Sequence, residues 1–182
     1  MTPSLYMTLE LPGDLRGIPR CESVPEYEDE FDNVLSILTD LCEQLSKVDG
    51  VRFLISGFGQ DDWNASVNRE LCLLLEQLPA VAQEIVSGST EFTIEFVEQG
   101  FWRTLSFSGA GDELAVSCAS GDPWTPDPEV VGISRRDLAD MLSVLVERFY
   151  GAANVACPEL VAHPWFSEWR SSVSVLAGAP PD

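Results

Sequence analysis

The chain has 182 residues, 45% hydrophobic and 22% charged, a composition typical of one folded globular domain rather than a disordered or fibrous protein. Its 30 Asp and Glu against 10 Lys and Arg give a formal net charge of −20, which disfavours binding to nucleic acid or to an anionic membrane surface. No run approaches the roughly 20 apolar residues that span a bilayer, and no secretory signal pattern is visible, so we expect a cytoplasmic protein.

We expect residues 1–182 to form a single domain with flexible ends at residues 1–3 and 178–182. The one histidine, His163, excludes metal sites that need two or three histidines, and we predict no cofactor. The cysteines are odd in number and far apart in the chain, without the close spacing of zinc or redox motifs. We therefore predict reduced thiols that mostly serve as small core residues, at Cys21, Cys42, Cys72, Cys118 and Cys157.

The first 50 residues contain one strand pattern and one helix pattern. Alternating apolar residues predict a strand over 4–11, and Gly and Pro residues predict a loop from there to Pro25. The acidic run from Glu26 to Asp32 leads into apolar residues at three-and-four spacing, which predicts a helix with an acidic first turn and a buried stripe. That stripe comprises Phe31, Val34, Leu35, Leu38, Leu41, Cys42, Leu45 and Val48.

The next segment predicts a buried strand over 51–56, a turn-rich stretch at 57–62 and a second helix from about Asn64. Pro79 lies within the helical pattern, so we expect the helix to kink there or to restart as a short helix through Ile85. Three runs of alternating apolar residues follow within about 91–118, separated by turn residues. They predict an antiparallel three-stranded meander.

A proline-rich loop around Trp124 leads to the most strongly marked helix of the chain. Ser134 and Asp137 resemble a capping box, and apolar residues at helical spacing continue up to Gly151. We expect a short helix from Pro158 and a further helix over 165–176. Local strand pairing with helices toward both ends predicts an α+β fold, in which the antiparallel sheet packs against N-terminal and C-terminal helices.

The sequence carries no complete catalytic or metal signature. The segment 56–61 lies between a strand and a helix, but it has two glycines and no Lys-Ser/Thr pair, so an ordinary turn is favoured over a phosphate loop. His163 is six residues from Cys157, which places the two on different sides of a helix and favours a structural role over that of a base. The aromatic cluster at 165–169 suits core packing better than a partner surface.

One charge pattern stands out. Between Arg20 and Lys47 there are eight acidic residues and no base. Like charges packed this closely repel one another, a cost that a docking surface for a basic protein would explain, and a solvated acidic face is the alternative. The candidate partner-binding residues are Glu26, Glu28, Asp29, Glu30 and Asp32.

These patterns predict a non-enzymatic, acidic protein-binding domain with a basic protein partner. Its most concrete form is a bacterial immunity- or antitoxin-like inhibitor, because opposite charge speeds the capture of a basic toxin, and the Arg-over-Lys usage resembles a GC-rich bacterial genome. The alternative is an enzyme or small-ligand-binding protein with an aromatic pocket between the sheet and the helices, lined by Trp102, Arg103 and Trp124. A deep pocket with a buried Arg would favour that alternative, and a convex acidic patch would favour the binding domain.

Overall fold

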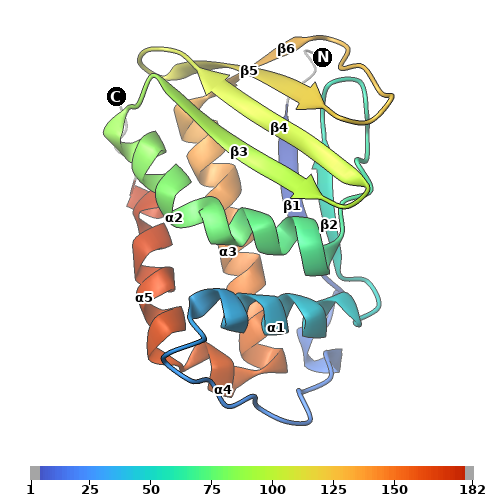
Figure 1. The fold of residues 1–182 in the computed structure, drawn as a ribbon, viewed down its shortest axis with the longest axis vertical. Helices are drawn as coiled ribbons and strands as arrows, with labels where there is room; N and C mark the ends of the chain where they lie inside the picture. Colours follow the sequence, from blue (N-terminus) through green and yellow to red (C-terminus); the bar gives the residue numbers. More distant parts are fainter. Residues whose placement is uncertain (1–4, 179–182) are drawn as a thin grey trace.

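The computed structural model describes residues 5–178, and these residues form an α+β fold, as the sequence predicts (Figure 1). The expected flexible ends lie outside the described residues, except for Gly178, which ends a 3-10 helix. The strands are β1 (Tyr6–Glu10), β2 (Arg52–Ser56), β3 (Glu91–Glu98), β4 (Phe101–Ser108), β5 (Glu113–Ser120) and β6 (Val130–Ser134). The helices are α1 (Val34–Ser46), α2 (Cys72–Ser87), α3 (Arg135–Ala156), α4 (Pro158–Val161) and α5 (Pro164–Val173), with shorter segments η1 (Leu15–Gly17), η2 (Val67–Leu71) and η3 (Ser174–Gly178).

The larger sheet has four antiparallel strands in the order β3-β4-β5-β6. The predicted meander over 91–118 is confirmed, and its apolar residues alternate onto one buried face because successive strand side chains point to opposite sides. The expectation that the proline-rich loop runs directly into the helix is wrong. Strand β6 intervenes, with Val131 and Ile133 buried against β5 partners Val116 and Leu114.

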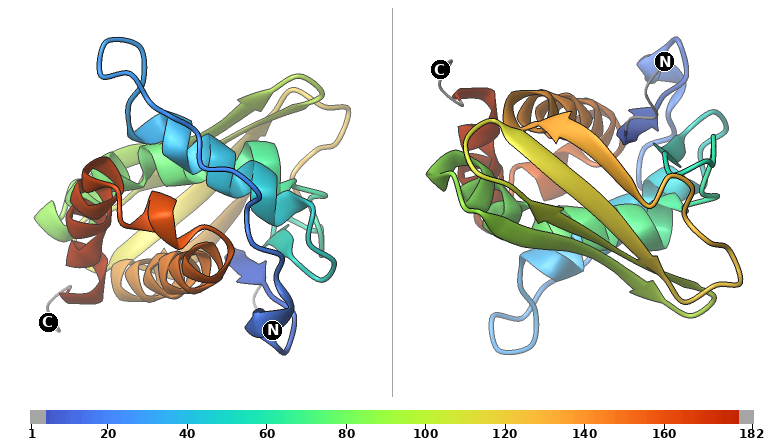
Figure 2. Two further views of the ribbon diagram at one scale, coloured as in Figure 1. Left: turned by 90° about the horizontal axis from the view of Figure 1, so that it is seen from below. Right: turned by 90° about the horizontal axis from the view of Figure 1, so that it is seen from above.

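The helices cover one face of this sheet and leave the other face open (Figures 1 and 2). A second, two-stranded sheet of β1 and β2 lies beside α3. Two side chains of α3 bind the outer edge of β1: the Met7 N–H donates to the Met141 sulfur at 3.1 Å, and Arg148 donates to the Leu9 carbonyl at 3.2 Å. Among residues 5–178, no helix has the length and apolar character needed to cross a membrane.

Helix α2 runs through Pro79 without interruption, so the expected restart after Pro79 does not occur. Its buried stripe continues on both sides of the proline, from Leu74 to Ile85, and this packing outweighs the lost backbone hydrogen bond. The α-helix also begins later than expected, at Cys72, after the π-helical turn η2. The side-chain amide of Gln77 exchanges two hydrogen bonds of 2.8 Å with the backbone of Glu95 and thereby covers the outer edge of β3.

Helix α3 starts where the sequence predicts, because the Ser134 hydroxyl accepts a 2.9 Å hydrogen bond from the Asp137 N–H. It does not stop at Gly151 but continues to Ala156. A glycine inside a helix costs about 1 kcal/mol relative to Ala, and burial of the small residues that follow offsets this cost. These buried residues are Ala152, Ala153 and Ala156.

Candidate functional site

The acidic run does not form the first turn of α1. Asn33 caps the helix, since its side-chain oxygen accepts a 2.8 Å hydrogen bond from the Leu35 N–H, and helical geometry begins at Val34. Residues 26–32 therefore form a separate segment ahead of the helix, called the acidic turn below. Phe31, expected in the buried stripe, is instead 77% exposed within this turn. Asn33 was the available sequence signal, because Asn is a preferred cap immediately before an apolar-periodic segment.

The acidic turn is closed by its own hydrogen bonds. The Glu28 carbonyl accepts from the backbone N–H groups of Phe31 and Asp32, at 2.9 and 2.8 Å. The Asp32 carboxylate accepts from the Glu28 N–H at 3.0 Å and from the Ser36 hydroxyl at 2.8 Å, and these two bonds lower the pKa of Asp32. Asp32 therefore shapes the turn and joins it to the first turn of α1.

Tyr27 anchors the base of the acidic turn to the helices. Its hydroxyl donates a 2.6 Å hydrogen bond to Asp40 of α1, and burial followed by this bond raises the pKa of Tyr27. Its ring packs against His163 and Trp165, with centroid distances of 5.8 and 6.2 Å. His163 also caps α5 by accepting a 3.3 Å hydrogen bond from the Trp165 N–H, so the only histidine has the structural role that the sequence favours.

The other four acids of the turn carry charge that nothing nearby neutralises. Glu26, Glu28, Asp29 and Glu30 are exposed, and within residues 5–178 their carboxylates take part in no ion pair or hydrogen bond. The loop that contains them projects from the body of the protein in both views of Figure 2. Phe31 is thus exposed in the same turn as four carboxylates that have no partner in the described chain. Hydrogen bonds of Tyr27 and Asp32 fix the backbone of this turn.

The alternative pocket is not formed as predicted, because Trp102 and Arg103 point to opposite sides of the sheet. They are consecutive residues of β4, and side chains alternate along a strand. Trp102 is 56% exposed on the open face, where its ring covers Gly121 so closely that a β-carbon there would clash with it. Arg103, 5% exposed, is enclosed on the inner face.

Arg103 and Trp124 do come together, as predicted, with two aromatic residues that the sequence reasoning missed. The guanidinium lies 4.4 Å from the Trp124 ring centroid, 4.5 Å from that of Trp63 and 5.0 Å from that of Phe101. We call these four residues the Arg103 cage. Phe101 could have been found from the sequence, because it lies two residues before Arg103 in β4 and therefore on the same face of the sheet. Trp63 could not, because it lies in a loop far away in the chain.

The Arg103 cage buries its arginine, which is 5% exposed. Burial lowers the pKa of Arg103, and the nearest carboxylate, Asp122, lies 3.9 Å from its Nε atom. Nε and Nη1 have no hydrogen-bond partner among the described protein groups. The cavities along α3 and beside β2 include no residue of the cage.

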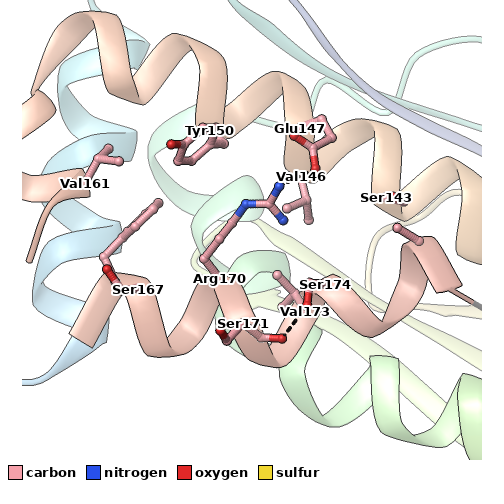
Figure 3. A pocket seen from close by; sticks show the side chains of 12 residues that line it. Ser143, Val146, Glu147, Tyr150, Val161, Ser167, Arg170, Ser171, Val173 and Ser174 are labelled. Carbon is pink, nitrogen blue, oxygen red and sulfur yellow. Dashed lines mark hydrogen bonds and ion pairs between the residues drawn. The ribbon is translucent and has the colours of Figure 1, made fainter. Parts of the chain in front are cut away.

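The largest of these cavities is a groove of about 420 Å³ between α3 and the segment formed by α5 and η3. Figure 3 shows Arg170 reaching across it from α5 toward Glu147 of α3, with Tyr150 beside them. Arg170 forms an ion pair with Glu147, and its guanidinium lies 5.2 Å from the Tyr150 ring centroid. Arg170 and Glu147 are the charged residues among the described lining of the groove, and they neutralise each other.

Comparisons with protein-family models, curated proteins and solved structures find no match to this chain. Within residues 5–178, no three His, Cys, Asp or Glu side chains gather closely enough to hold a metal ion. The acidic turn is thus the candidate site that combines predicted residues with an exposed and ordered geometry.

Proposed function

We propose that this chain is a non-enzymatic protein-binding domain that uses its acidic turn to hold a basic protein partner. The observation that carries the proposal is the exposure of Phe31 among Glu26, Glu28, Asp29 and Glu30, whose carboxylates have no partner in the described chain. Aromatic anchors surrounded by a polar rim are typical of protein interfaces. Unpaired carboxylates add long-range attraction for a basic surface.

The anchoring of the turn supports the same role. Binding costs less conformational entropy when the contacting segment is already ordered, and Tyr27 and Asp32 hold this turn by side-chain hydrogen bonds. The proposal therefore divides the five candidate residues. Four acids face the partner, whereas Asp32 keeps the turn in shape.

The most concrete form of this function is an immunity- or antitoxin-like inhibitor that captures a basic toxin. A formal net charge of −20 accelerates the encounter with a basic protein, and rapid capture is what such an inhibitor needs. The aromatic-pocket alternative has less support, since aromatic rings cover Arg103, which is 5% exposed, and Trp102 lies on the opposite face of the sheet.

Site-specific photo-cross-linking in the native host tests the proposal. Phe31 is replaced by the photoreactive analogue p-benzoylphenylalanine, and Trp102, an exposed aromatic residue on the open sheet face, is replaced in a control. We expect the probe at position 31 to form an adduct with a basic protein, identified by mass spectrometry, and the probe at position 102 not to form it. The same adduct from both positions, or an acidic protein as the main adduct at position 31, contradicts the proposal.

Charge dependence gives the second arm of the test. A variant with Glu26→Gln, Glu28→Gln, Asp29→Asn and Glu30→Gln should lose most of the adduct. A control with four exposed acids changed to amides elsewhere, Asp49, Glu91, Glu129 and Asp140, should retain it. Inhibition of the purified partner's activity by the unmodified chain then decides whether the domain is an inhibitor.

A further inference from the structure

Four of the five cysteines form two pairs that the sequence spacing does not reveal. Cys42, on α1, and Cys72, the first residue of α2, form one pair, in which each thiol shifts the pKa of the other. Cys21, in the loop before α1, and Cys157, between α3 and α4, form the second pair. All are free thiols, so each pair joins segments that are distant in the chain without a covalent bond.

The surroundings of Cys72 distinguish it from the other cysteines. The Thr39 hydroxyl lies 3.6 Å from its sulfur, and Thr39 and Cys42 lie three residues apart on the same side of α1. Thr39 and Cys42 therefore lie on the side of α1 that meets the Cys72 sulfur at the start of α2. Cys72 is partly exposed, whereas Cys42 is fully buried behind it.

This arrangement favours a thiolate at Cys72 and a protonated thiol at Cys42. The neighbouring Cys42 thiol is the main reason that the pKa of Cys72 falls to about 7, and Thr39 contributes in the same direction, while burial, Glu76 and Glu98 oppose it. Burial raises the pKa of Cys42. In the second pair, burial raises the pKa of Cys157 to about 12, so that sulfur stays protonated at neutral pH.

We propose that Cys72 and Cys42 are a peroxide-responsive thiol pair, in which hydrogen peroxide oxidises Cys72 and Cys42 then closes a disulfide between α1 and α2. Thiolates that are accessible and lie next to a second cysteine are the ones that peroxide oxidises selectively and reversibly. This inference concerns residues outside the acidic turn and does not depend on the proposed partner.

The chemistry balances in two steps. The Cys72 thiolate attacks one oxygen of hydrogen peroxide, the O–O bond breaks, and a sulfenic acid and hydroxide form, with sulfur oxidised and peroxide reduced by two electrons. The Cys42 sulfur then attacks the Cys72 sulfur, the S–O bond breaks, and the departing hydroxide combines with the Cys42 proton. The products are one disulfide, one water and the hydroxide of the first step, which takes up the proton that Cys72 released on ionising and becomes a second water.

The negative charge of the protein is the reason for proposing hydrogen peroxide as the oxidant. Hydrogen peroxide is neutral, so neither the net charge of −20 nor Glu76 and Glu98 near Cys72 repels it. Oxidised glutathione carries a net negative charge at neutral pH, and the same field lowers its local concentration. We therefore expect hydrogen peroxide to form the bond faster than oxidised glutathione at equal concentration.

Peptide mapping after oxidation tests the pairing. The reduced protein is treated with a slight excess of hydrogen peroxide at pH 7.5, the remaining thiols are blocked with N-ethylmaleimide, and the digest is analysed by mass spectrometry. We expect a peptide linked through Cys42 and Cys72, lost after dithiothreitol, while Cys21, Cys118 and Cys157 are recovered as maleimide adducts. Preferential oxidation of the Cys21–Cys157 pair, or no linked peptide, overturns the proposal.

Two variants assign the order of the steps. With Cys42→Ala, Cys72 should stop at the sulfenic acid and be trapped by dimedone, and Cys72→Ser should give neither adduct nor linked peptide. Unmodified protein supplies a readout that does not depend on the variants folding: below the unfolding temperature, Cys72 should react with iodoacetamide at pH 7 about 100-fold faster than Cys118 or Cys157. Equal reactivity of the three thiols overturns the proposal.

Discussion

The acidic turn and the Arg103 cage handle charge in opposite ways. The turn exposes four carboxylates that have no partner among residues 5–178, beside a 77% exposed phenylalanine, whereas the cage removes one guanidinium from solvent between aromatic rings. Exposed like charges contribute little or nothing to stability and leave attraction available for a partner. A buried cation contributes to stability through the packing of its side chain and through its attraction to the aromatic rings around it. The contrast agrees with the proposal, in which the turn binds a partner and the cage stabilises the fold.

The largest effect is expected at the cage. Arg103→Ala removes a buried side chain and its ring contacts, and we expect the free energy of unfolding to fall by about 3 kcal/mol. Arg136→Ala is the matched control, because Arg136 is exposed and uses only its backbone N–H in hydrogen bonding, and it should change stability by less than about 0.5 kcal/mol. Urea unfolding measures the free energy of unfolding of both variants. A loss for Arg103→Ala as small as that for Arg136→Ala would contradict a stabilising role of the cage.

Arg103→Met sharpens the result by separating packing from charge. Methionine keeps the aliphatic length and brings no unpaired N–H groups, whereas Nε and Nη1 of Arg103 have no hydrogen-bond partner in the described part of the chain. We expect this variant to lose less than about 1.5 kcal/mol in the same urea experiment. A loss as large as that of Arg103→Ala would mean that the cation itself, through the rings, holds the cage together.

A helix cap outside both regions gives a neutral reference. Ser134→Ala removes the hydroxyl that accepts from the Asp137 N–H, and we expect a loss of about 1 kcal/mol. Ser108→Ala is the control, since Ser108 is exposed and its hydroxyl forms no hydrogen bond in the described chain. Equal urea midpoints for the two variants would contradict the cap assignment.

The base of the acidic turn is expected to contribute a similar amount. Tyr27→Phe removes the 2.6 Å hydrogen bond to Asp40, which should cost about 1 kcal/mol and loosen the turn. Tyr6→Phe serves as the control, because Tyr6 is exposed and its hydroxyl has no hydrogen bond among described residues. The rate of amide hydrogen exchange at Phe31 and Asp32 reports directly on the turn. An unchanged rate in Tyr27→Phe would show that Tyr27 does not stabilise the turn.

The four carboxylates of the turn should matter least for stability. Changing Glu26, Glu28, Asp29 and Glu30 to amides relieves like-charge repulsion, so the free energy of unfolding should stay within about 0.5 kcal/mol or rise. With the cross-linked partner purified, association at low salt should slow about tenfold, and the difference should shrink as salt is added. Slower association at every salt concentration alike would mean a lost contact rather than lost steering.

Asp32 is expected to give a small effect that depends on pH. Its pKa in the folded chain lies below the ordinary value of 3.8, so its carboxylate stabilises the turn above that value and loses this effect as the pH falls through the folded pKa. Carbon-detected NMR titration of Asp32 measures this. Ser36→Ala removes one of the two donors and should move the pKa of Asp32 up toward its ordinary value. An unchanged titration would contradict the hydrogen bond between Ser36 and Asp32.

Local patterns in the sequence determined the α+β class, the meander and the start of α3. Strand alternation and the Ser134 cap act between neighbouring residues, so the pattern of the chain carries this information by itself. The same rule shows that Trp102 and Arg103, as neighbours on a strand, cannot share a pocket. The prediction that the acidic run forms the first turn of the helix was wrong, because Asn33 caps α1 and leaves the run ahead of it.

Tertiary structure alone decided the features that depend on contacts between distant segments. Strand β6 pairs with β5 although it is short and contains Gly132, and α2 passes Pro79 because both sides of the proline are buried. Trp63 meets Arg103, and Cys42 meets Cys72, only after separate segments have packed together. These contacts are stabilised by burying surface between two elements of the fold. The local sequence pattern of one element does not indicate which other element it packs against.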